Sequence, residues 1–373
     1  MEINNDFPVE LVLMNTEFYM SARQKVYATM RLMFPFFWRP RGLVPSLADL
    51  SVTDNVLAKR DVSLPVRGKN SGHHPLIVAE LAGGKIIGDL RLVATAGDAV
   101  VGGLQGLFGC ADPHNHYLLH RRRLRVPKYW SGTALLLGTA NSDNYYHWLL
   151  ESLPRWKMLQ AAGYVLYDHV LLHSKPLVFQ DETLDRLKVP REKRRRLSKN
   201  FVHQFERLIV PAMPFPPERV SPWACAWVRS LFPETVSGPE MIYLARPGIG
   251  RRALVNQPEL ETELKARGFV SIQPEALTVA EQAKQLGSAR YVIAPHGAAL
   301  ANVVFAPAGA AVLELFHPQH KKSYYLSLAE ACGLRYACLD GQPTGRADDH
   351  KLECIIDVSA VLEKLEQASR CDP

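Results

Sequence analysis

The segment NSDNYYHWLLESLPRW, residues 141 to 156, places a histidine and two carboxylates among residues that favour burial. On a helix, His147 and Glu151 are four positions apart and share one face, and Asp143 lies one turn before His147. A histidine oriented by a carboxylate suits general base catalysis, because its unperturbed pKa lies near neutrality. The same residues would also suit a buried, hydrogen-bonded core helix. The segment therefore predicts either a reactive helix face or a well-packed one.

A second candidate site lies in RYVIAPHGAALANVVFAPAGAAVLELF, which is predicted to form a strand, a tight turn, a helix and another strand. Gly297 permits a sharp turn, and a helix beginning near Ala298 would offer free N–H groups to a phosphate. His296 follows the first strand, Asn302 lies one turn into the helix, and Glu314 ends the second strand. We expect Glu314 to accept the hydroxyls of a ribose. The alternative is that His296 only caps a turn and Glu314 is exposed.

The loop in IYLARPGIGRRALVNQPEL offers positive charge at a neighbouring strand end. Arg246 leaves the strand, and Arg252 follows six residues later in a glycine-rich stretch. Two arginines at one sheet edge could clamp a diphosphate, although loop arginines are often merely solvated. Asn256 is predicted to cap the next helix, with Glu259 completing a capping box. Anion-binding groups on two strand-end loops favour a nucleotide site.

Alternating strands and helices must position these residues. In the first half, strands are predicted at 132–140, 167–174 and 206–213, with helices at 141–162 and 181–189. The proline-rich stretch 211–222 is predicted to be a linker, after which the alternation starts again at 240–246. Such alternation is typical of parallel sheets with crossover helices. We predict an α/β protein with an irregular N-terminal arm, an acceptor-side domain, a nucleotide-binding domain and a tail helix, at residues 1–70, 71–235, 236–350 and 351–373.

The composition limits the function classes. The chain has 373 residues, 47% of them apolar, and a net charge of +7 with a pI near 9.0, which favours anionic partners. The basic runs RRRLRVPK and REKRRR have no zinc-ligand spacing or base-stacking motif beside them, so we expect no nucleic-acid binding. Six scattered cysteines, an acidic start and no long apolar run predict a cytoplasmic protein without a signal peptide or membrane span. The aromatic and basic segment 30–42 is either an arm on the core or a patch that touches a membrane.

Three blocks in order, NYYHWLLESLPRW, YLARPGIGRRALVN and YVIAPHGAALANVVF with VLELF, resemble glycosyltransferase family 61. This family includes bacterial proteins of capsular and exopolysaccharide synthesis. The resemblance covers roughly residues 130–320 and implies a GT-B-like α/β fold, in which two Rossmann-like domains with parallel sheets face a central cleft. It also implies inversion at the anomeric carbon and no essential metal or other cofactor. One departure is Gln257, where family members often have Glu.

The resemblance also assigns roles by position. His147 falls on the acceptor-side motif, and Glu314 lies at the second strand end. The spacing to Asn256 favours Arg252 over Arg251 as the clamp. The residues that match donor-side motifs are Arg246, Arg252, His296, Gly297, Ala298 and Asn302. Together with Asn256 and Glu314, they are expected to bind the donor.

From these observations we expect an inverting glycosyltransferase of bacterial capsular polysaccharide, exopolysaccharide or lipopolysaccharide synthesis. His147 would be the base, oriented by Glu151 or Asp143. Its partners would be a nucleotide-sugar donor and a glycan acceptor, with a lipid-linked glycan and peripheral contact at the inner face of the membrane as further hypotheses. The alternative is a non-catalytic nucleotide- or glycan-binding scaffold of a polysaccharide assembly complex.

Overall fold

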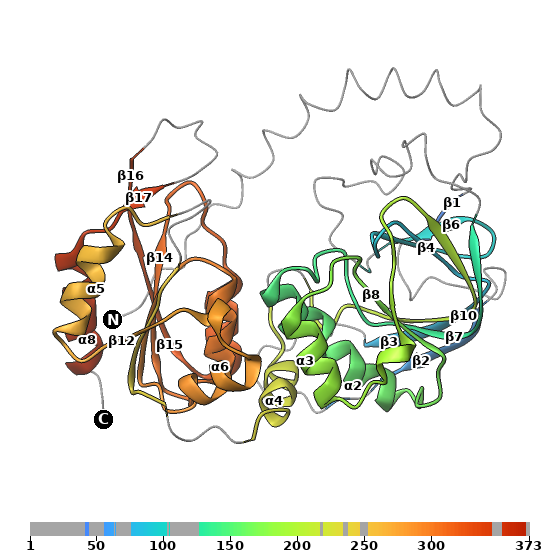
Figure 1. Cartoon of the computed structure of the whole chain (residues 1–373), viewed down its shortest axis with the longest axis horizontal. Coiled ribbons are helices and arrows are strands. Elements are labelled where there is room, and N and C mark those ends of the chain that lie inside the picture. The colour runs from blue at the N-terminus through green and yellow to red at the C-terminus, as the bar shows by residue number, and fades with distance from the viewer. Residues whose placement is uncertain are drawn as a thin grey trace, which may run out of the picture.

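The computed structural model of the chain is described for most of residues 56–370 (Figure 1). The described residues are 42–44, of which only the backbone is considered, and 56–62, 64, 76–102, 104, 127–216, 219–233, 238–246, 253–344 and 353–370. Arg251, Arg252 and the segment 30–41 therefore lie outside the described residues.

A mixed sheet of ten described strands forms the N-terminal unit, at the right of Figure 1. Its main path is β1-β6-β5-β4-β10-β7-β8-β9, while β3 pairs with both β2 and β10. Strands β10, β7, β8 and β9 are parallel, whereas β3 and β4 run antiparallel to β10. The expectation of a parallel sheet is thus right for only part of this unit. The strands are β1 (Gly42–Val44), β2 (Val56–Asp61), β3 (Ile77–Ala82), β4 (Lys85–Ile87), β5 (Leu92–Ala94), β6 (Ala99–Val101), β7 (Lys128–Leu136), β8 (His169–Leu172), β9 (Arg194–Arg196) and β10 (Val202–Pro211). Because β1 and β2 belong to this sheet, the first 70 residues are not wholly irregular.

The helix predicted after β7 begins later than expected and has two parts. Residues His147–Ser152 form a π-helix, η6, and Pro154–Ala161 form α2. Proline has no N–H to donate, and just before it the Leu153 N–H donates to the Trp148 carbonyl five residues back. The remaining helices up to the linker are α3 (Val178–Arg186) and the short 3₁₀ turn η7 (Arg191–Lys193), and α4 (Pro222–Ser230) follows the proline-rich stretch.

The C-terminal unit contains a fully parallel five-stranded sheet in the order β12-β11-β13-β14-β15. Helices α5 and α8 pack on one face, and α6, η9 and α7 pack on the other (Figure 1). The strands are β11 (Met241–Leu244), β12 (Val270–Ile272), β13 (Tyr291–Pro295), β14 (Ala311–Phe316) and β15 (Arg335–Asp340). The helices are α5 (Gln257–Lys265), η8 (Pro274–Ala276), α6 (Val279–Leu286), η9 (Ala298–Phe305), α7 (Tyr324–Cys332) and α8 (Val358–Arg370), and β16 (Gln342–Pro343) pairs with β17 (Cys354–Ile355).

Element η9 is a 3₁₀ helix, whereas the sequence predicts an α-helix there. Its bonds span three residues, as from the Leu300 N–H to the Gly297 carbonyl. Two adjacent β-branched residues, Val303 and Val304, and Pro307 just past its end disfavour an α-helical continuation.

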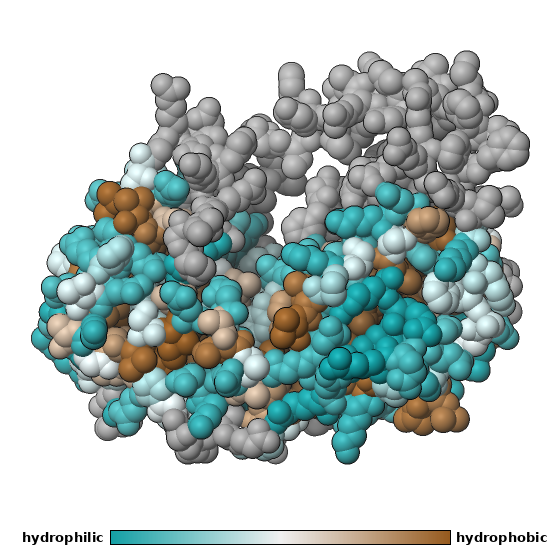
Figure 2. All heavy atoms as spheres, viewed as in Figure 1, coloured by the Kyte–Doolittle hydropathy of each residue, from teal (hydrophilic) through white to brown (hydrophobic). Residues whose placement is uncertain are grey.

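The two units share one continuous hydrophobic core. Buried residues of η6 and α2, such as Trp148, belong to the same cluster as residues of α6, η9 and α7. Polar contacts cross the joint as well: the Glu182 carboxylate of α3 accepts from the N–H groups of Val279 and Ala280, at 2.7 and 2.9 Å, at the start of α6. Figure 1 shows these helices between the two sheets, and the face seen in Figure 2 is largely hydrophilic over the N-terminal unit. None of the described helices combines the length and apolarity that crossing a bilayer requires.

Candidate active site

His147 and Glu151 lie side by side on η6. The distance from His147 Nδ1 to Glu151 Oε2 is 2.8 Å, and the two side chains are 17% and 14% exposed. The contact has ion-pair distance without hydrogen-bond geometry, and Nδ1 is buried. The exposed part of the ring therefore lies on the opposite edge, which carries Nε2. Asp143 is exposed in the preceding turn, so the structure brings Glu151, and not Asp143, to the histidine.

Arg155, which the sequence analysis did not single out, anchors the helix that carries this pair. It is completely buried, and its guanidinium donates to the carbonyls of Gly138 and Pro211, at 2.8 and 2.5 Å. These carbonyls lie at or just after the carboxyl ends of the parallel strands β7 and β10. Burial lowers the pKa of Arg155 to about 9, and Glu151 partly offsets this effect. Arg155 thus holds η6 and α2 against the sheet edge and places a buried positive charge near Glu151.

Arg246, His296 and Gly297 form a second cluster, here called the Arg246 corner. Arg246 follows β11 and His296 follows β13. The chain continues from β11 to β12 on one side of this strand pair and from β13 to β14 on the other side. Ligands of open α/β sheets bind at such a switch point, beyond the carboxyl ends of the strands. Among described groups, Arg246 has one hydrogen-bond acceptor, the His296 carbonyl, which lies 3.1 Å from Nη1. Its other N–H groups have no acceptor among the residues that the structure describes, and an anion could bind them.

Gly297 allows the Arg246 guanidinium to lie against the backbone. A Cβ on this residue would come within 3.2 Å of Arg246 Nη1. The backbone at Gly297 is fully extended, which any residue adopts. A side chain here would push the Arg246 guanidinium back by a few tenths of an ångström, so the glycine contributes space and not the sharp turn expected from the sequence. Burial also lowers the pKa of Arg246, while Glu275 and Tyr325 act in the opposite direction.

The surroundings of Glu314 differ from those expected of a carboxylate that accepts ribose hydroxyls. It is completely buried, one carboxylate oxygen contacts His296 Nδ1, and the other accepts from the Tyr336 hydroxyl at 2.6 Å. Both oxygens are therefore engaged by protein groups, and the expected role of accepting ribose hydroxyls does not fit this arrangement. Glu314 instead orients the His296 ring, which also stacks on Phe316 with ring centroids 5.0 Å apart.

Asn302 and Asn256 are likewise used inside the protein. Asn302 is completely buried; its Oδ1 accepts from the Tyr145 hydroxyl at 2.8 Å, and its Nδ2 donates to Gln282 at 2.6 Å. Asn302 therefore connects the N-terminal unit to α6, and its side chain is not available to bind a nucleotide-sugar. Asn256 occupies the predicted N-cap position of α5, but its side chain pairs with the backbone of Ile356 and donates to the Glu259 carboxylate at 3.2 Å. Neither side chain bonds the backbone of the other residue, so the predicted capping box is wrong. Ala298 is the first residue of η9, as the turn predicts.

Three tyrosines, here called the tyrosine bridge, connect the histidine pair to the Arg246 corner. Tyr146 lies 5.3 Å from His147 and 5.5 Å from Tyr325, measured between ring centroids, and Tyr325 lies 5.4 Å from His296. Tyr324 contacts Tyr146 and His147 at 5.3 and 6.4 Å. The Tyr325 hydroxyl also donates to the Gly297 carbonyl at 2.6 Å. The sequence analysis missed the YY pair of α7, because only the fold brings it to the joint.

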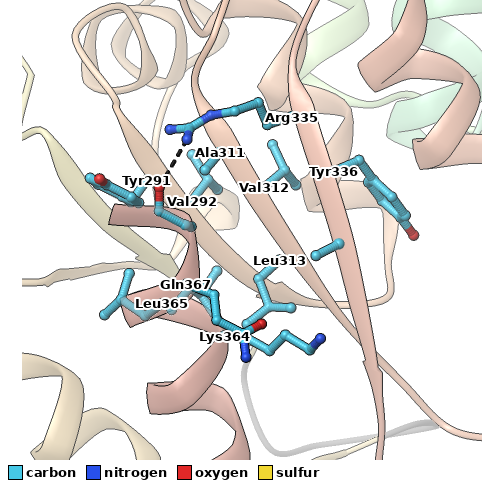
Figure 3. Close-up of a pocket in the computed structure, with 13 residues that line it drawn as sticks. Tyr291, Val292, Ala311, Val312, Leu313, Arg335, Tyr336, Lys364, Leu365 and Gln367 are labelled. Atoms are coloured by element: carbon cyan, nitrogen blue, oxygen red, sulfur yellow. Dashed lines mark hydrogen bonds between the residues drawn. The ribbon is translucent and has the colours of Figure 1, made fainter. Parts of the chain in front are cut away.

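A cavity of about 270 Å³ lies away from this site, between α8 and strands β13, β14 and β15 (Figure 3). Its lining is mainly apolar, and Arg335 spans it by donating to the Ala368 carbonyl at 2.9 Å. The Tyr336 hydroxyl points out of the cavity, toward Glu314. The cavity contains neither His147 nor the Arg246 corner, so we do not assign the reaction to it.

Comparison with known proteins bears on the same residues. Residues 145–313 match the family model described as Glycosyltransferase 61. The matched part begins beside His147 and extends through β11, β13 and η9, so it contains both halves of the site. No curated protein matches the chain. This part of the chain is therefore similar to glycosyltransferase family 61, and the similarity supports a glycosyltransferase activity in general.

Proposed function

We propose that the protein is an inverting, metal-independent glycosyltransferase of GT-B architecture that transfers a sugar from a nucleotide-sugar to a hydroxyl of a glycan. The observation that carries the proposal is the meeting of the His147–Glu151 pair and the Arg246 corner at the joint between the units, connected by the tyrosine bridge. We place the reaction in bacterial capsular polysaccharide, exopolysaccharide or lipopolysaccharide synthesis, at the cytoplasmic side of the membrane. A lipid-linked glycan is our candidate acceptor.

In the proposed reaction, His147 Nε2 takes the proton of the acceptor hydroxyl while that oxygen attacks the anomeric carbon. The bond from this carbon to the diphosphate oxygen breaks at the same time, and its electron pair leaves with the diphosphate. Arg246 and the N–H groups at the start of η9 stabilise the developing negative charge. Arg252, which lies outside the described residues, is the proposed second clamp. Glu151 orients His147, and Glu314 orients His296 beside the departing group.

Activity against a panel of nucleotide-sugars tests this proposal against the scaffold alternative. Thermal shifts first identify the donor, because a ligand that binds the folded state raises the melting temperature. We then expect transfer or slow hydrolysis of that donor, at the same rate with and without EDTA. A donor that binds but is never consumed, with any glycan acceptor offered, would identify a binding scaffold instead. Loss of transfer in EDTA, restored by a divalent cation, would refute only the metal independence and would leave the proposed transferase activity standing.

Arg246→Ala is expected to weaken the binding of the nucleoside diphosphate about tenfold or more, since a charge-assisted contact to phosphate contributes about 1.5–3 kcal/mol. Isothermal titration with the diphosphate measures the effect. Arg267→Ala is the matched control, because Arg267 is an exposed arginine of the same unit paired with Glu263 at 2.7 Å. Equal affinity of the Arg246 and Arg267 variants would remove Arg246 from the donor site.

A further inference from the structure

The loop at residues 163–168, between α2 and β8, exposes two adjacent aliphatic side chains. Val165 is 65% exposed and Leu166 is 87% exposed. The loop is firmly held at both ends: the Tyr164 hydroxyl donates to Glu80 at 3.0 Å, and the Tyr167 ring lies 5.7 Å from that of Trp156. The two aliphatic residues are thus presented to solvent by a fixed support.

A cation stacks on each of the two tyrosines that bracket the aliphatic pair. The Arg60 guanidinium lies 4.9 Å from the centre of the Tyr164 ring, and Lys193 Nζ lies 4.8 Å from the centre of the Tyr167 ring. Lys193 also donates to the Tyr167 carbonyl at 2.7 Å. The loop therefore has an apolar tip, flanking aromatic rings and flanking positive charges.

Further positive charge comes from the basic run that the proposed reaction leaves unused. Residues 188–196 contain six Lys or Arg and one Glu, and two acidic residues of α3, Asp181 and Asp185, pair with several of the arginines. A surplus of three positive charges remains after these acidic residues are counted. Strand β9 begins at Arg194 and is parallel to β8, so residues 188–193, which precede β9, and the loop, which precedes β8, lie at the same, amino-terminal, edge of the sheet.

We propose that this edge is a docking surface for an anionic lipid bilayer, in which Val165 and Leu166 enter the headgroup region and the surrounding cations contact lipid phosphates. Apolar side chains inserted beside tyrosines and cations are the means by which peripheral proteins bind membranes. The charge surplus favours an anionic surface over a neutral partner. The Arg155 contacts mark the opposite, carboxyl, edge of the same sheet, so the docking surface does not overlap the reactive joint.

Flotation of the full chain with vesicles tests the surface without relying on transferase activity. We expect the protein to float with phosphatidylglycerol-containing vesicles at low salt, and much less with pure phosphatidylcholine. The double variant Val165→Ser, Leu166→Ser should reduce the bound fraction about tenfold, because two inserted aliphatic side chains are lost. Arg195→Glu should reduce it further at low salt and have little effect at high salt.

The control is Val178→Ser, which alters a side chain that is 79% exposed at the other end of β8 and should leave flotation unchanged. Three results would each overturn the proposal. The wild-type protein could fail to float on anionic vesicles, or the double serine variant could float as well as wild type, which would assign binding to another segment. Light scattering could also show a wild-type dimer that the double serine variant dissolves, which would make the surface a contact between two copies.

Discussion

His147→Ala is expected to reduce turnover about 10²- to 10⁴-fold, because general base catalysis contributes an effect of this size. This corresponds to about 3–5 kcal/mol of transition-state free energy. Binding of the nucleotide-sugar should persist, since the Arg246 corner belongs to the other unit and is connected to His147 through Tyr146 and Tyr325. Steady-state kinetics with the identified donor measures turnover, and titration calorimetry measures binding.

Two further variants define the role of His147. His169→Ala is the matched control, since His169 lies in the same unit at the start of β8 and contacts Ser131; it should retain full activity. Glu151→Gln should give an intermediate loss, because the ring keeps its place but loses its negative partner. The competing base is His296, which has its own carboxylate partner in Glu314. Normal turnover in His147→Ala, together with lost turnover and retained donor binding in His296→Ala, would transfer the role to His296.

Much of the C-terminal unit could be predicted from the sequence, because each strand and helix there is a local segment with its own apolar pattern. The strands predicted at β11, β13 and β14, the helix predicted at α5 and the tail helix, α8, all exist. The mixed sheet of the N-terminal unit could not be predicted in full. Strand β10 pairs with β7 on one edge and with β3 and β4 on the other, and these partners are 70 or more residues away. Nothing in the local pattern of β10 specifies such pairings.

The candidate site, too, could be predicted from the sequence only in part. The pairing of His147 with Glu151 could be predicted, because four-residue spacing brings two side chains together on any helix, even though this one proves to be a π-helix. The surroundings of Glu314 and Asn302 could not be predicted, because they depend on Tyr336 and Tyr145, which come from other elements. A polar residue beside a predicted turn has the same sequence whether it faces a ligand or a buried partner.

Arg155→Met is expected to have the largest effect on stability, lowering the free energy of unfolding by about 3–5 kcal/mol. Methionine fills much of the space but leaves the carbonyls of Gly138 and Pro211 without their charged donor. The buried charge itself opposes folding: burial lowers the pKa of Arg155 to about 9, well below the usual range of an arginine, so folding disfavours the protonated form throughout the range below pH 9. The variant is relieved of the cost of burying a charge but loses the two hydrogen bonds. We expect the loss to dominate, because Gly138 and Pro211 are both buried and their carbonyls would lack a donor. Urea denaturation and thermal melting measure the difference.

The comparison with an exposed arginine separates this effect from a general loss of positive charge. Arg267→Met should change the free energy of unfolding by no more than about 0.5 kcal/mol, since Arg267 pairs with Glu263 in solvent. Arg155→Lys keeps the charge, but its single ammonium group cannot reach the ends of β7 and β10 together as a forked guanidinium does, so it should recover only part of the loss. If Arg155→Met unfolds at the same urea concentration as Arg267→Met, the bonds to the strand ends contribute nothing net. The position of His147 would then have to depend on the packing of Trp148 and its apolar neighbours in the shared core alone.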